Sequence, residues 1–360
     1  MALIAIVAIV IAACGTGEEA EETTTTGAEA TTTSAAPEPT TTAGEAAIGT
    51  EENPIQVLFV PSVSAEETIA GGEVLEATLE AETGLSFVVD VPTSYGAVLE
   101  EMCAAPDRTI GFIPAQAYVL GSDRCGIEVA LKSLRFGYDE YWTQFVVPRD
   151  SDIQSIDDLA GRTWAYVDPG STSGYLVPYG MFLDMGLETG DTLEAGSHDA
   201  VIQAIYQGDA EFGTTFFSPA INAAGEPLWD GDPANADVPA DLVESCGLDA
   251  EGEIACGEDF FPRDARRNIR EASPDVIQQV RIVTLSNPIP NDTMSFSPDF
   301  DEATQAIIVD AMKAFAENDP EGFATAFDSY SWSGVTDTTD ADFDSIRAIV
   351  NALGIGPDDL

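Results

Sequence analysis

Strand-like and helical segments alternate along this chain, and the alternation takes place twice. Apolar runs bounded by turn residues are followed by stretches with apolar residues at helical spacing, from Ile55 to Val147 and again from Arg162 to Leu285. This pattern predicts an α/β architecture in which helices flank a largely parallel sheet. The expected strands are Ile55–Val60, Leu85–Val91, Thr109–Ile113, Glu128–Leu134 and Tyr141–Val147, then Arg162–Val167, a short strand near Leu193, Glu211–Phe217 and Gln279–Leu285.

The break in the alternation predicts two lobes. The turn-rich segment Pro148–Leu159 separates the two series, and a length of 360 residues suits about two domains. The last part is helical, as in Ala303–Asn318, and has no strand partner of its own, so we expect it to pack on the first lobe. The first lobe would comprise residues 54–147 and 286–360, and the second residues 148–285. The chain would cross between the lobes near Val147 and near Leu285, with a cleft between them.

The N-terminus has the features of a leader and a tether. Residues 1–13 are apolar but too few for a transmembrane helix, and they match the core of a signal peptide. Cys14 follows small residues and resembles the lipobox cysteine of bacterial lipoproteins, which implies lipidation; the alternative is a chance cysteine after an uncleaved signal. Residues 14–53 contain nine Glu and no basic residue, which predicts a disordered tether. The folded body would then lie on the outer face of a membrane.

Charge and composition exclude several functions. The chain has 64 Asp and Glu against 13 Lys and Arg, a net charge of −51, so it lacks the basic surface that nucleic-acid binding needs. Such acidity suits a surface hydrated in strong salt, or simply an acidic extracytoplasmic protein. His198 is the only histidine and no CxxC pair is present, so we expect no metal site and no cofactor.

Four cysteines remain after Cys14, an even number in an oxidising compartment. Cys246 and Cys256 lie ten residues apart in an acidic loop, and Cys103 and Cys125 flank a strand-like segment. We expect these two pairs to form disulfides, with buried free thiols as the alternative.

The run AYVDPGSTSGYLVP, residues 165–178, carries the clearest sign of a binding site. A strand enters a turn and a helix leaves it, so Ser171, Thr172 and Ser173 fall at the helix N-terminus. Free backbone N–H groups and the positive end of the helix dipole meet there, which favours a tetrahedral oxyanion. From composition alone, an ordinary Ser/Thr helix cap explains the same residues.

This run resembles the signature D-P-x-S-T-S-G-[FY]-L-x-P of substrate-binding proteins of phosphate, phosphite and phosphonate ABC transporters. Three further stretches resemble that family in the same order: SYGAVLEEM (94–102), SHDAVIQAIYQGDAEFG (197–213) and NPIPND (287–292). The resemblance extends over roughly residues 55–353. It implies a type II periplasmic-binding-protein fold and a lipid-anchored receptor, a monomer, that captures a phosphorus oxyanion and delivers it to a permease with its ATPase.

The resemblance also implies a pocket. Ser171, Thr172, Ser173 and Gly174 would hold the anion's oxygens, Tyr95 and Tyr141 would add phenol donors, His198 would donate from its own helix, and Asp292 would line the cleft. On sequence alone, the tyrosines could instead be core or surface residues, His198 a helix cap and Asp292 a turn residue. Ser218 lies where aminophosphonate binders of the family have an acidic residue, so the expected ligand is phosphate, phosphite or a simple alkylphosphonate.

Two other functions remain open. A sensory or adhesive surface module could use the same fold without a transporter. A serine hydrolase is disfavoured because the chain has no GxSxG motif, and we expect no enzyme activity. The basic cluster of Arg263, Arg266, Arg267 and Arg270 could contact a transporter subunit or offset nearby acidic residues.

Overall fold

A computed structural model describes residues 46–356 and 359. The expected leader, Cys14 and most of the tether lie outside the described residues. From Ala46 onward the chain forms one compact unit. The end of the expected tether is part of that unit, because the Ser86 amide donates to the Gly49 carbonyl at 2.9 Å and Arg108 donates to the Asn53 side chain at 2.8 Å. The prediction of disorder as far as Asn53 is therefore wrong for this last turn, in which Ile48 packs on the core.

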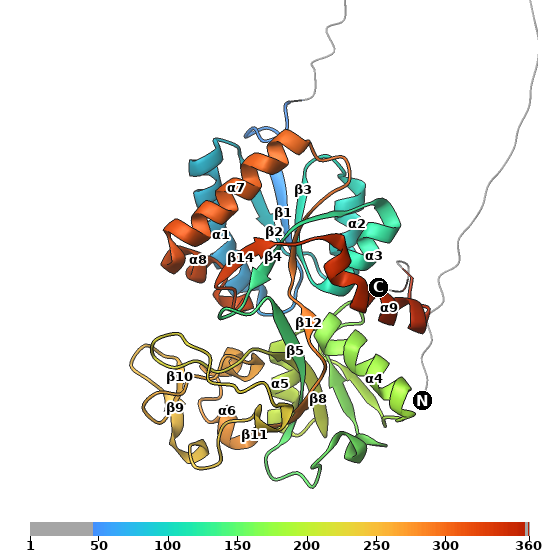
Figure 1. Ribbon diagram of the computed structural model, residues 1–360, viewed down its shortest axis with the longest axis vertical. Helices are drawn as coiled ribbons and strands as arrows, with labels where there is room; N and C mark the ends of the chain where they lie inside the picture. Colours follow the sequence, from blue (N-terminus) through green and yellow to red (C-terminus); the bar gives the residue numbers. More distant parts are fainter. Residues whose placement is uncertain (1–45, 357–358, 360) are drawn as a thin grey trace, which may run out of the picture. The chain divides into compact units, whose positions relative to one another are not determined.

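The first lobe is built on a six-stranded sheet in the order β14-β4-β13-β3-β1-β2. Helices cover both of its faces, with α1, α7 and α8 on one side and α2 and α3 on the other (Figure 1). The strands are β1 (Ile55–Phe59), β2 (Phe87–Asp90), β3 (Thr109–Ile113), β4 (Glu128–Leu134), β13 (Thr293–Phe296) and β14 (Gly334–Asp337); the helices are α1 (Ala65–Thr83), α2 (Tyr95–Ala104), α3 (Ala115–Cys125), α7 (Glu302–Asn318), α8 (Pro320–Ala326) and α9 (Asp344–Leu353).

The second lobe contains a sheet in the order β11-β5-β8-β6-β7, to which the short β12 adds by pairing with β5. Its strands are β5 (Glu140–Pro148), β6 (Trp164–Tyr166), β7 (Thr192–Glu194), β8 (Phe212–Phe217), β11 (Val280–Leu285) and β12 (Ile289–Pro290), with a separate hairpin of β9 (Cys246–Leu248) and β10 (Ile254–Cys256). Its helices are α4 (Val177–Met185), α5 (His198–Gln207) and α6 (Val276–Gln279). Short helical turns occur at Ile156–Leu159, Thr172–Leu176, Pro233–Asn235, Val243–Ser245 and Ala265–Ile269, and in the first lobe at Asp328–Tyr330 and Asp340–Phe343.

The sequence placed β5 in the wrong lobe. Residues Tyr141–Val147 were expected to end the first sheet, but β5 pairs antiparallel with β8 and β11 in the second. The first crossing between the lobes therefore lies at residues 135–139, where Gly137 adopts the left-handed conformation and Arg135 pairs with Tyr138. Strand pairing is a long-range property, so the order of segments along the chain could not assign β5 to a sheet.

The sheets are also less parallel than expected. Among the strands of residues 46–356, parallel pairing is confined to β1 with β2 and β3, and to β6 with β7 and β8. The C-terminal part returns to the first lobe, as expected, but it brings two strands that the sequence analysis missed: β13 pairs antiparallel with β3 and β4, and β14 with β4.

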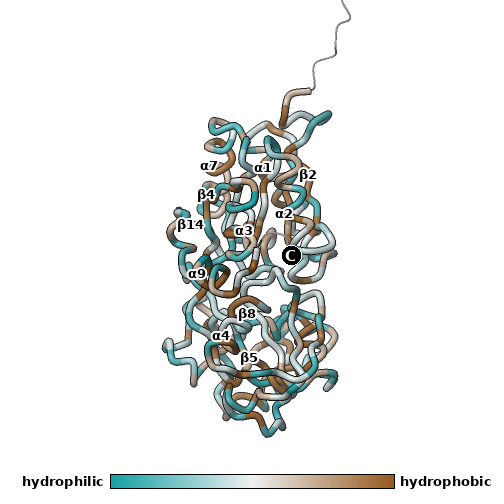
Figure 2. Tube along the Cα trace, turned by 90° about the vertical axis from the view of Figure 1, so that its right-hand side faces the viewer, coloured by the Kyte–Doolittle hydropathy of each residue, from teal (hydrophilic) through white to brown (hydrophobic). Residues whose placement is uncertain are grey.

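The central strands of each sheet lie in the hydrophobic core of their lobe. All residues of β3 and β8 are buried, as expected for strands covered on both faces. In the first lobe, Phe59 stacks on Phe112 and Phe327 on Trp332, and the two pairs meet through a tilted contact between Phe112 and Phe327. In the second lobe, Trp164 packs with Phe182 and Phe212. Hydrophobic stretches run through both lobes along the chain trace (Figure 2). Both expected disulfides are present, Cys103–Cys125 between the ends of α2 and α3 and Cys246–Cys256 across the β9–β10 hairpin.

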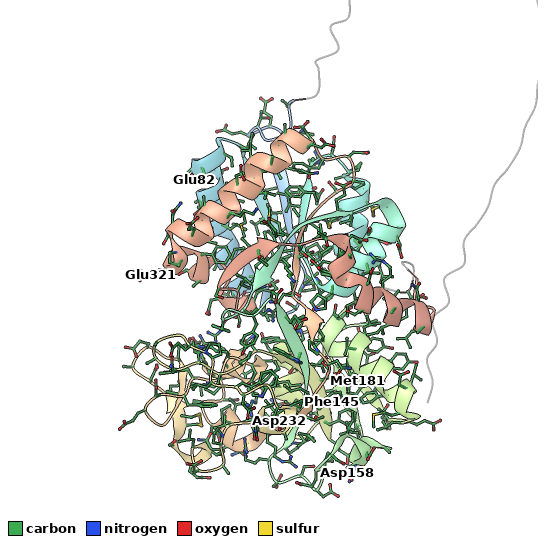
Figure 3. All side chains as sticks on the ribbon, viewed as in Figure 1. Glu82, Phe145, Asp158, Met181, Asp232 and Glu321 are labelled. Carbon is green, nitrogen blue, oxygen red and sulfur yellow. A yellow bond between two sulfur atoms is a disulfide. The ribbon has the colours of Figure 1, made fainter. Side chains whose placement is uncertain are left out.

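The acidic residues lie mainly on the outside. Glu82 and Glu321 project from the periphery of the first lobe and Asp158 from that of the second, whereas Phe145 lies inside the second (Figure 3). Within the described part of the chain, none of the helices combines the length and the hydropathy that crossing a membrane would require.

Candidate ligand-binding site

The Ser-Thr-Ser turn is held in place by its own hydrogen bonds and by the sheet beneath it. After β6 the chain turns at Asp168, whose carboxylate accepts a hydrogen bond of 2.7 Å from the Gly170 amide. The Ser171 hydroxyl then accepts from the Gly174 amide at 3.1 Å and caps the helical turn that leads into α4. Thr143 on β5 and Thr214 on β8 donate to the carbonyls of Ser173 and Gly174. Local sequence and tertiary contacts thus fix the same conformation.

A small cavity of about 20 Å³ lies against this turn and is lined by both lobes. Tyr95 at the start of α2 contributes from the first lobe, and Ser171 and Ser173 from the second. The remaining lining residues are Val60, Ser62, Val63, Pro114, Arg135, Tyr141, His198, Phe216, Asp292, Ser329 and Tyr330.

Six of the eight residues expected to bind the ligand line this cavity: Tyr95, Tyr141, Ser171, Ser173, His198 and Asp292. Thr172 and Gly174 do not. The Thr172 hydroxyl accepts a hydrogen bond of 2.8 Å from the Gln116 amide of the first lobe, so it joins the lobes. Gly174 packs under the turn, where an added Cβ would lie 2.4 Å from Val167 Cγ2. Neither residue lines the cavity, and the expectation that they contact the anion stays a prediction.

Arg135 is a cavity residue that the sequence analysis missed. Arg135 is 4% exposed, and its Nη2 forms an ion pair with Asp292 Oδ2. The guanidinium carbon lies 4.6 Å from the centre of the Tyr141 ring and 5.4 Å from that of Phe216. Its Nε and Nη1 are buried and have no hydrogen-bonding partner among the described residues. Buried donors of this kind are uncommon in native proteins, and here they lie beside a cavity.

Tyr95, Tyr141 and His198, which also line the cavity, are uncharged at pH 7. Burial raises the pKa of the Tyr95 and Tyr141 phenols well above their ordinary value, so both keep their protons and can donate. Burial, with a smaller contribution from nearby Arg135, lowers the pKa of His198 to about 3. His198 is therefore a neutral imidazole at pH 7, and its buried Nδ1 has no partner in the described structure. One N–H of that ring is available to a ligand or a water molecule.

The first lobe adds Ser62, Ser329 and Tyr330 to the cavity, none of which the sequence singled out. The Tyr330 hydroxyl donates to the Val60 carbonyl at 2.7 Å, and the Ser62 carbonyl accepts from the His198 amide at 2.8 Å. The second of these bonds joins the first lobe to the start of α5. A hydrogen bond between the lobes therefore joins two residues that line the cavity, Ser62 and His198.

Two other sequence features lie away from the cavity lining. Ser218 is buried and does not line the cavity. In the arginine cluster, Arg266 pairs with Asp264 and Asp237, and Arg267 with Glu253 and Asp328. Arg266 and Arg267 are 1% and 2% exposed. They balance acidic side chains, which agrees with the second of the two interpretations of the cluster.

The arrangement suits a small anion. The side chains that line the cavity present hydroxyls, a neutral imidazole and one guanidinium, with Asp292 as the one carboxylate. Within the described residues no group of three His, Cys, Asp or Glu side chains is placed to hold a metal ion. Hydrogen bonds from a charged donor in a buried site are stronger than those from neutral donors, and Arg135 supplies that charge.

Comparisons with known proteins find chains of similar sequence and fold. The chain is 24% identical over 320 residues to the "Phosphate-import protein PhnD" of Mycolicibacterium smegmatis, which covers 83% of this chain and 86% of that protein. Among solved structures, the binding protein component of an ABC phosphonate transporter from Pseudomonas aeruginosa has a TM-score of 0.62 at 18% identity and covers 82% of this chain and 84% of its own. PhnD1 from Prochlorococcus marinus in complex with methylphosphonate has a TM-score of 0.61 at 13% identity, covering 83% and 98%.

These structural neighbours share the type II periplasmic-binding-protein fold, as the sequence analysis expected. The family model "ABC transporter, phosphonate, periplasmic substrate-binding protein" matches residues 57–343, most of the described chain. The chain belongs to the family of periplasmic substrate-binding proteins of phosphonate ABC transporters.

Proposed function

We propose that this protein is a lipid-anchored receptor that captures a small phosphorus oxyanion between its two lobes and delivers it to the permease of an ABC importer. Ser171, Ser173, Tyr95, Tyr141, His198, Arg135 and Asp292 would bind the anion. Binding needs no covalent chemistry, because a ligand that contacts both lobes stabilises the closed arrangement over an open one.

One observation carries the proposal. Arg135 Nε, Arg135 Nη1 and His198 Nδ1 are buried polar atoms without a partner among the described residues, and both side chains line the cavity between the lobes. An unpaired buried donor costs about 1–3 kcal/mol, and more when it is charged. An oxyanion in the cavity would supply acceptors for the guanidinium and imidazole N–H groups.

Arg135 is a basic side chain at the cavity of a strongly acidic protein, which supports an anion-binding site. The chain has only 13 basic residues against 64 acidic ones, and one of the 13 is buried at this cavity. Its attraction for an anion acts at short range in a water-poor site, whereas the negative surface field is screened beyond about 10 Å at 0.1 M salt. A strongly acidic protein can therefore bind an anion at this site.

The relatives support phosphorus as the central atom of the ligand. The Mycolicibacterium protein is named for phosphate import, and the Prochlorococcus structure contains methylphosphonate. The small cavity favours compact ligands of that kind over those with long substituents. We therefore take phosphate, phosphite and methylphosphonate as the candidates.

Isothermal titration of the purified protein in phosphate-free buffer tests the proposal, with phosphate, phosphite, methylphosphonate and 2-aminoethylphosphonate as ligands. We expect binding of at least one of the first three and loss of that binding in Arg135→Gln. Silence with all four ligands at both low and high salt would overturn the proposal. The anchor is tested separately, since Cys14→Ser should move the protein from the membrane fraction to the soluble fraction.

A further inference from the structure

We propose that Arg267 of the second lobe is a positioning residue for ligand capture. It contacts the two ends of a turn in the first lobe, Asp328 and Ser331, and the two residues between those ends, Ser329 and Tyr330, line the cavity. Arg267 itself does not line the cavity and need not touch the ligand. This inference rests on the proposed function and adds a residue that acts on the same cavity through another segment.

The turn is short and its conformation is unusual. Asp328–Tyr330 form a single helical turn, which ends at Ser331 with a φ of 58° and a ψ of 32°. This is the left-handed region, which residues other than glycine rarely occupy. Such a conformation persists where surrounding contacts determine it. Ser331 is 3% exposed, so those contacts come from packed neighbours.

Arg267 supplies several of these contacts from the second lobe. It is 2% exposed and lies in the short helical turn Ala265–Ile269. Its Nη2 donates to Asp328 Oδ1 at 2.9 Å. Its Nη1 donates to the Asp328 carbonyl at 3.3 Å and to the Ser331 hydroxyl at 3.4 Å. The planar, rigid guanidinium thus fixes both ends of the turn, and with them the place of the two residues that line the cavity.

The guanidinium has an acidic partner in each lobe. Within the second lobe, Arg267 Nη2 donates to Glu253 Oε2 at 3.1 Å, so its buried charge stays paired whether or not the lobes are closed. Asp328 belongs to the first lobe, and neither it nor Arg267 lies in the segments that cross between the lobes. Asp328 therefore meets Arg267 only when the lobes approach each other, and ligand-driven closure forms this contact.

Acidic residues of both lobes meet around this contact. Burial raises the pKa of Glu67 in the first lobe; Asp328 and Glu271 raise it further, whereas Arg270 and Arg267 lower it. Arg270 Nη2 also lies 4.0 Å from Asp328 Oδ2. Without the two arginines, closure would bring like charges of the two lobes together. The basic side chains of the second lobe thus make this part of the interface favourable.

A double-mutant cycle tests whether the Arg267–Asp328 contact supports binding. The full-length protein is titrated with phosphate, phosphite and methylphosphonate, and the ligand that the wild type binds most tightly is used for every variant. We expect Arg267→Gln to weaken binding by about tenfold, and Asp328→Asn by less because it keeps the backbone carbonyl that Arg267 contacts. The double variant should bind no more weakly than Arg267→Gln, since that substitution already removes the contact.

Hydrogen exchange reports directly on the turn. The Ser331 amide donates to the Asp328 carbonyl at 2.9 Å, and the Trp332 amide donates to the Phe327 carbonyl at 3.3 Å. With saturating ligand, mass spectrometry should show faster exchange of these amides in Arg267→Gln than in the wild type, and unchanged exchange in α7. Arg267→Lys keeps the charge without the planar fork and should recover part of the affinity and part of the protection.

Matched controls separate this contact from the general cost of removing a charge. Asp337→Asn is the control for Asp328→Asn, because both carboxylates are largely exposed and Asp337 pairs with Lys313 inside the first lobe. Arg266→Gln is the control for Arg267→Gln, because Arg266 is as deeply buried and its ion pairs lie within the second lobe. Both controls should keep the wild-type affinity. Circular dichroism shows whether each variant is folded; if Arg267→Gln is not, Asp328→Asn and its control decide the question.

The outcomes separate this inference from the proposed function. If folded Arg267→Gln binds within about threefold of the wild type, or if the two single effects add in the double variant, the inference is wrong while the proposed function stands. Unchanged exchange of the turn amides in Arg267→Gln also overturns it. If the wild-type protein binds none of the three anions, the proposed function itself fails, and this inference fails with it.

Discussion

The backbone amide of Gln116 in the first lobe donates a hydrogen bond of 2.8 Å to the side-chain hydroxyl of Thr172 in the second. The Gln116 side chain also donates to the Pro169 carbonyl at 2.9 Å. Both bonds end on the turn that carries Ser171 and Ser173. The middle residue of the Ser-Thr-Ser run therefore connects the lobes, while the residues on either side of it line the cavity. Three consecutive residues thus contact the other lobe, through Thr172, and line the cavity, through Ser171 and Ser173.

Replacing Thr172 with Val should weaken ligand binding although Thr172 does not line the cavity. Valine has almost the same shape but cannot accept the Gln116 hydrogen bond, so the closed form would contain a buried unpaired N–H. That costs about 1–3 kcal/mol, or roughly 5- to 150-fold in affinity, if the open form leaves the amide to water. Titration calorimetry measures the loss, and Thr172→Ser, which keeps the hydroxyl, is the matched control. Unchanged affinity in Thr172→Val would show that this bond does not contribute to closure.

Gly170 should be needed for the lobes to approach each other. A Cβ added at Gly170 would lie 2.6 Å from the Cβ of Tyr95, at the start of α2 in the first lobe. Gly170→Ala should therefore oppose closure, at a cost of about 1–3 kcal/mol by analogy with overpacked cores. We expect small-angle X-ray scattering to show no compaction when ligand is added. Gly247→Ala is the control, because no atom lies within 4 Å of its added Cβ, and compaction equal to that of this control would refute the prediction.

The two serines of the run should respond differently to truncation. Ser173→Ala removes a hydroxyl that lines the cavity and should weaken anion binding by about tenfold, with little change in melting temperature, given the worth of a hydrogen bond to a charged group. Ser171→Ala removes a similar hydroxyl and also the cap on the Gly174 amide, so it should cost about 1 kcal/mol of stability as well. Calorimetric titration and thermal melts of both variants make the comparison. Equal melting temperatures would mean that the cap adds no stability.

The sequence was most successful where structure is determined locally. Tyr95 at the start of α2 and His198 at the start of α5 each follow a serine that caps the helix. In the Ser-Thr-Ser turn, Ser171 itself caps the helical turn. Such capping signals extend over only a few residues and can be found in the sequence. Tyr95, His198, Ser171 and Ser173 all line the cavity. In these three segments a short sequence motif was enough to predict both the start of a helical segment and a residue that lines the cavity.

Sequence patterns are least informative where the position of a residue depends on pairing between distant segments. Arg135 lies in the crossing between β4 and β5, and it reaches the cavity only because β5 joins the second sheet. With β5 assigned to the first lobe, Arg135 had no reason to be near Ser171. One signal was available: a single arginine following a strand-like segment in a chain with only 13 basic residues. Buried cations in so acidic a protein need a partner or a function, and that criterion would have selected it.

Both disulfides should stabilise the fold. Cys103–Cys125 closes a segment of 22 residues and Cys246–Cys256 one of 10. In the chain-entropy model each contributes about 3 kcal/mol, with the longer segment contributing slightly more. Thermal melts with and without reductant should show a lower melting temperature in the reduced protein. The double variant Cys103→Ser with Cys125→Ser should reproduce about half of the effect, because it removes one of the two disulfides. An unchanged melt in reductant would contradict this expectation.

Asp199 should make stability fall as pH rises through about 6. It accepts hydrogen bonds from the Ser64 amide of the first lobe at 3.1 Å and from the Asn268 side chain at 3.0 Å. Burial, with a smaller contribution from Glu67, raises its pKa to about 6 from an ordinary value of 3.8. The folded state then binds a proton more tightly than the unfolded state, so the stability from this group is complete below pH 3.8 and is lost as pH rises through 6. The loss amounts to about 3 kcal/mol at most.

His198 acts in the opposite direction. Its pKa is lowered in the folded state, so the unfolded state binds the proton more tightly and the fold loses stability as pH falls below 6.5. The difference between the unfolding free energies of wild type and Asp199→Asn, measured in denaturant at pH 4, 5, 6 and 7, isolates the Asp199 contribution. A difference that stays constant across this range would show that Asp199 titrates at its ordinary pKa in the folded protein.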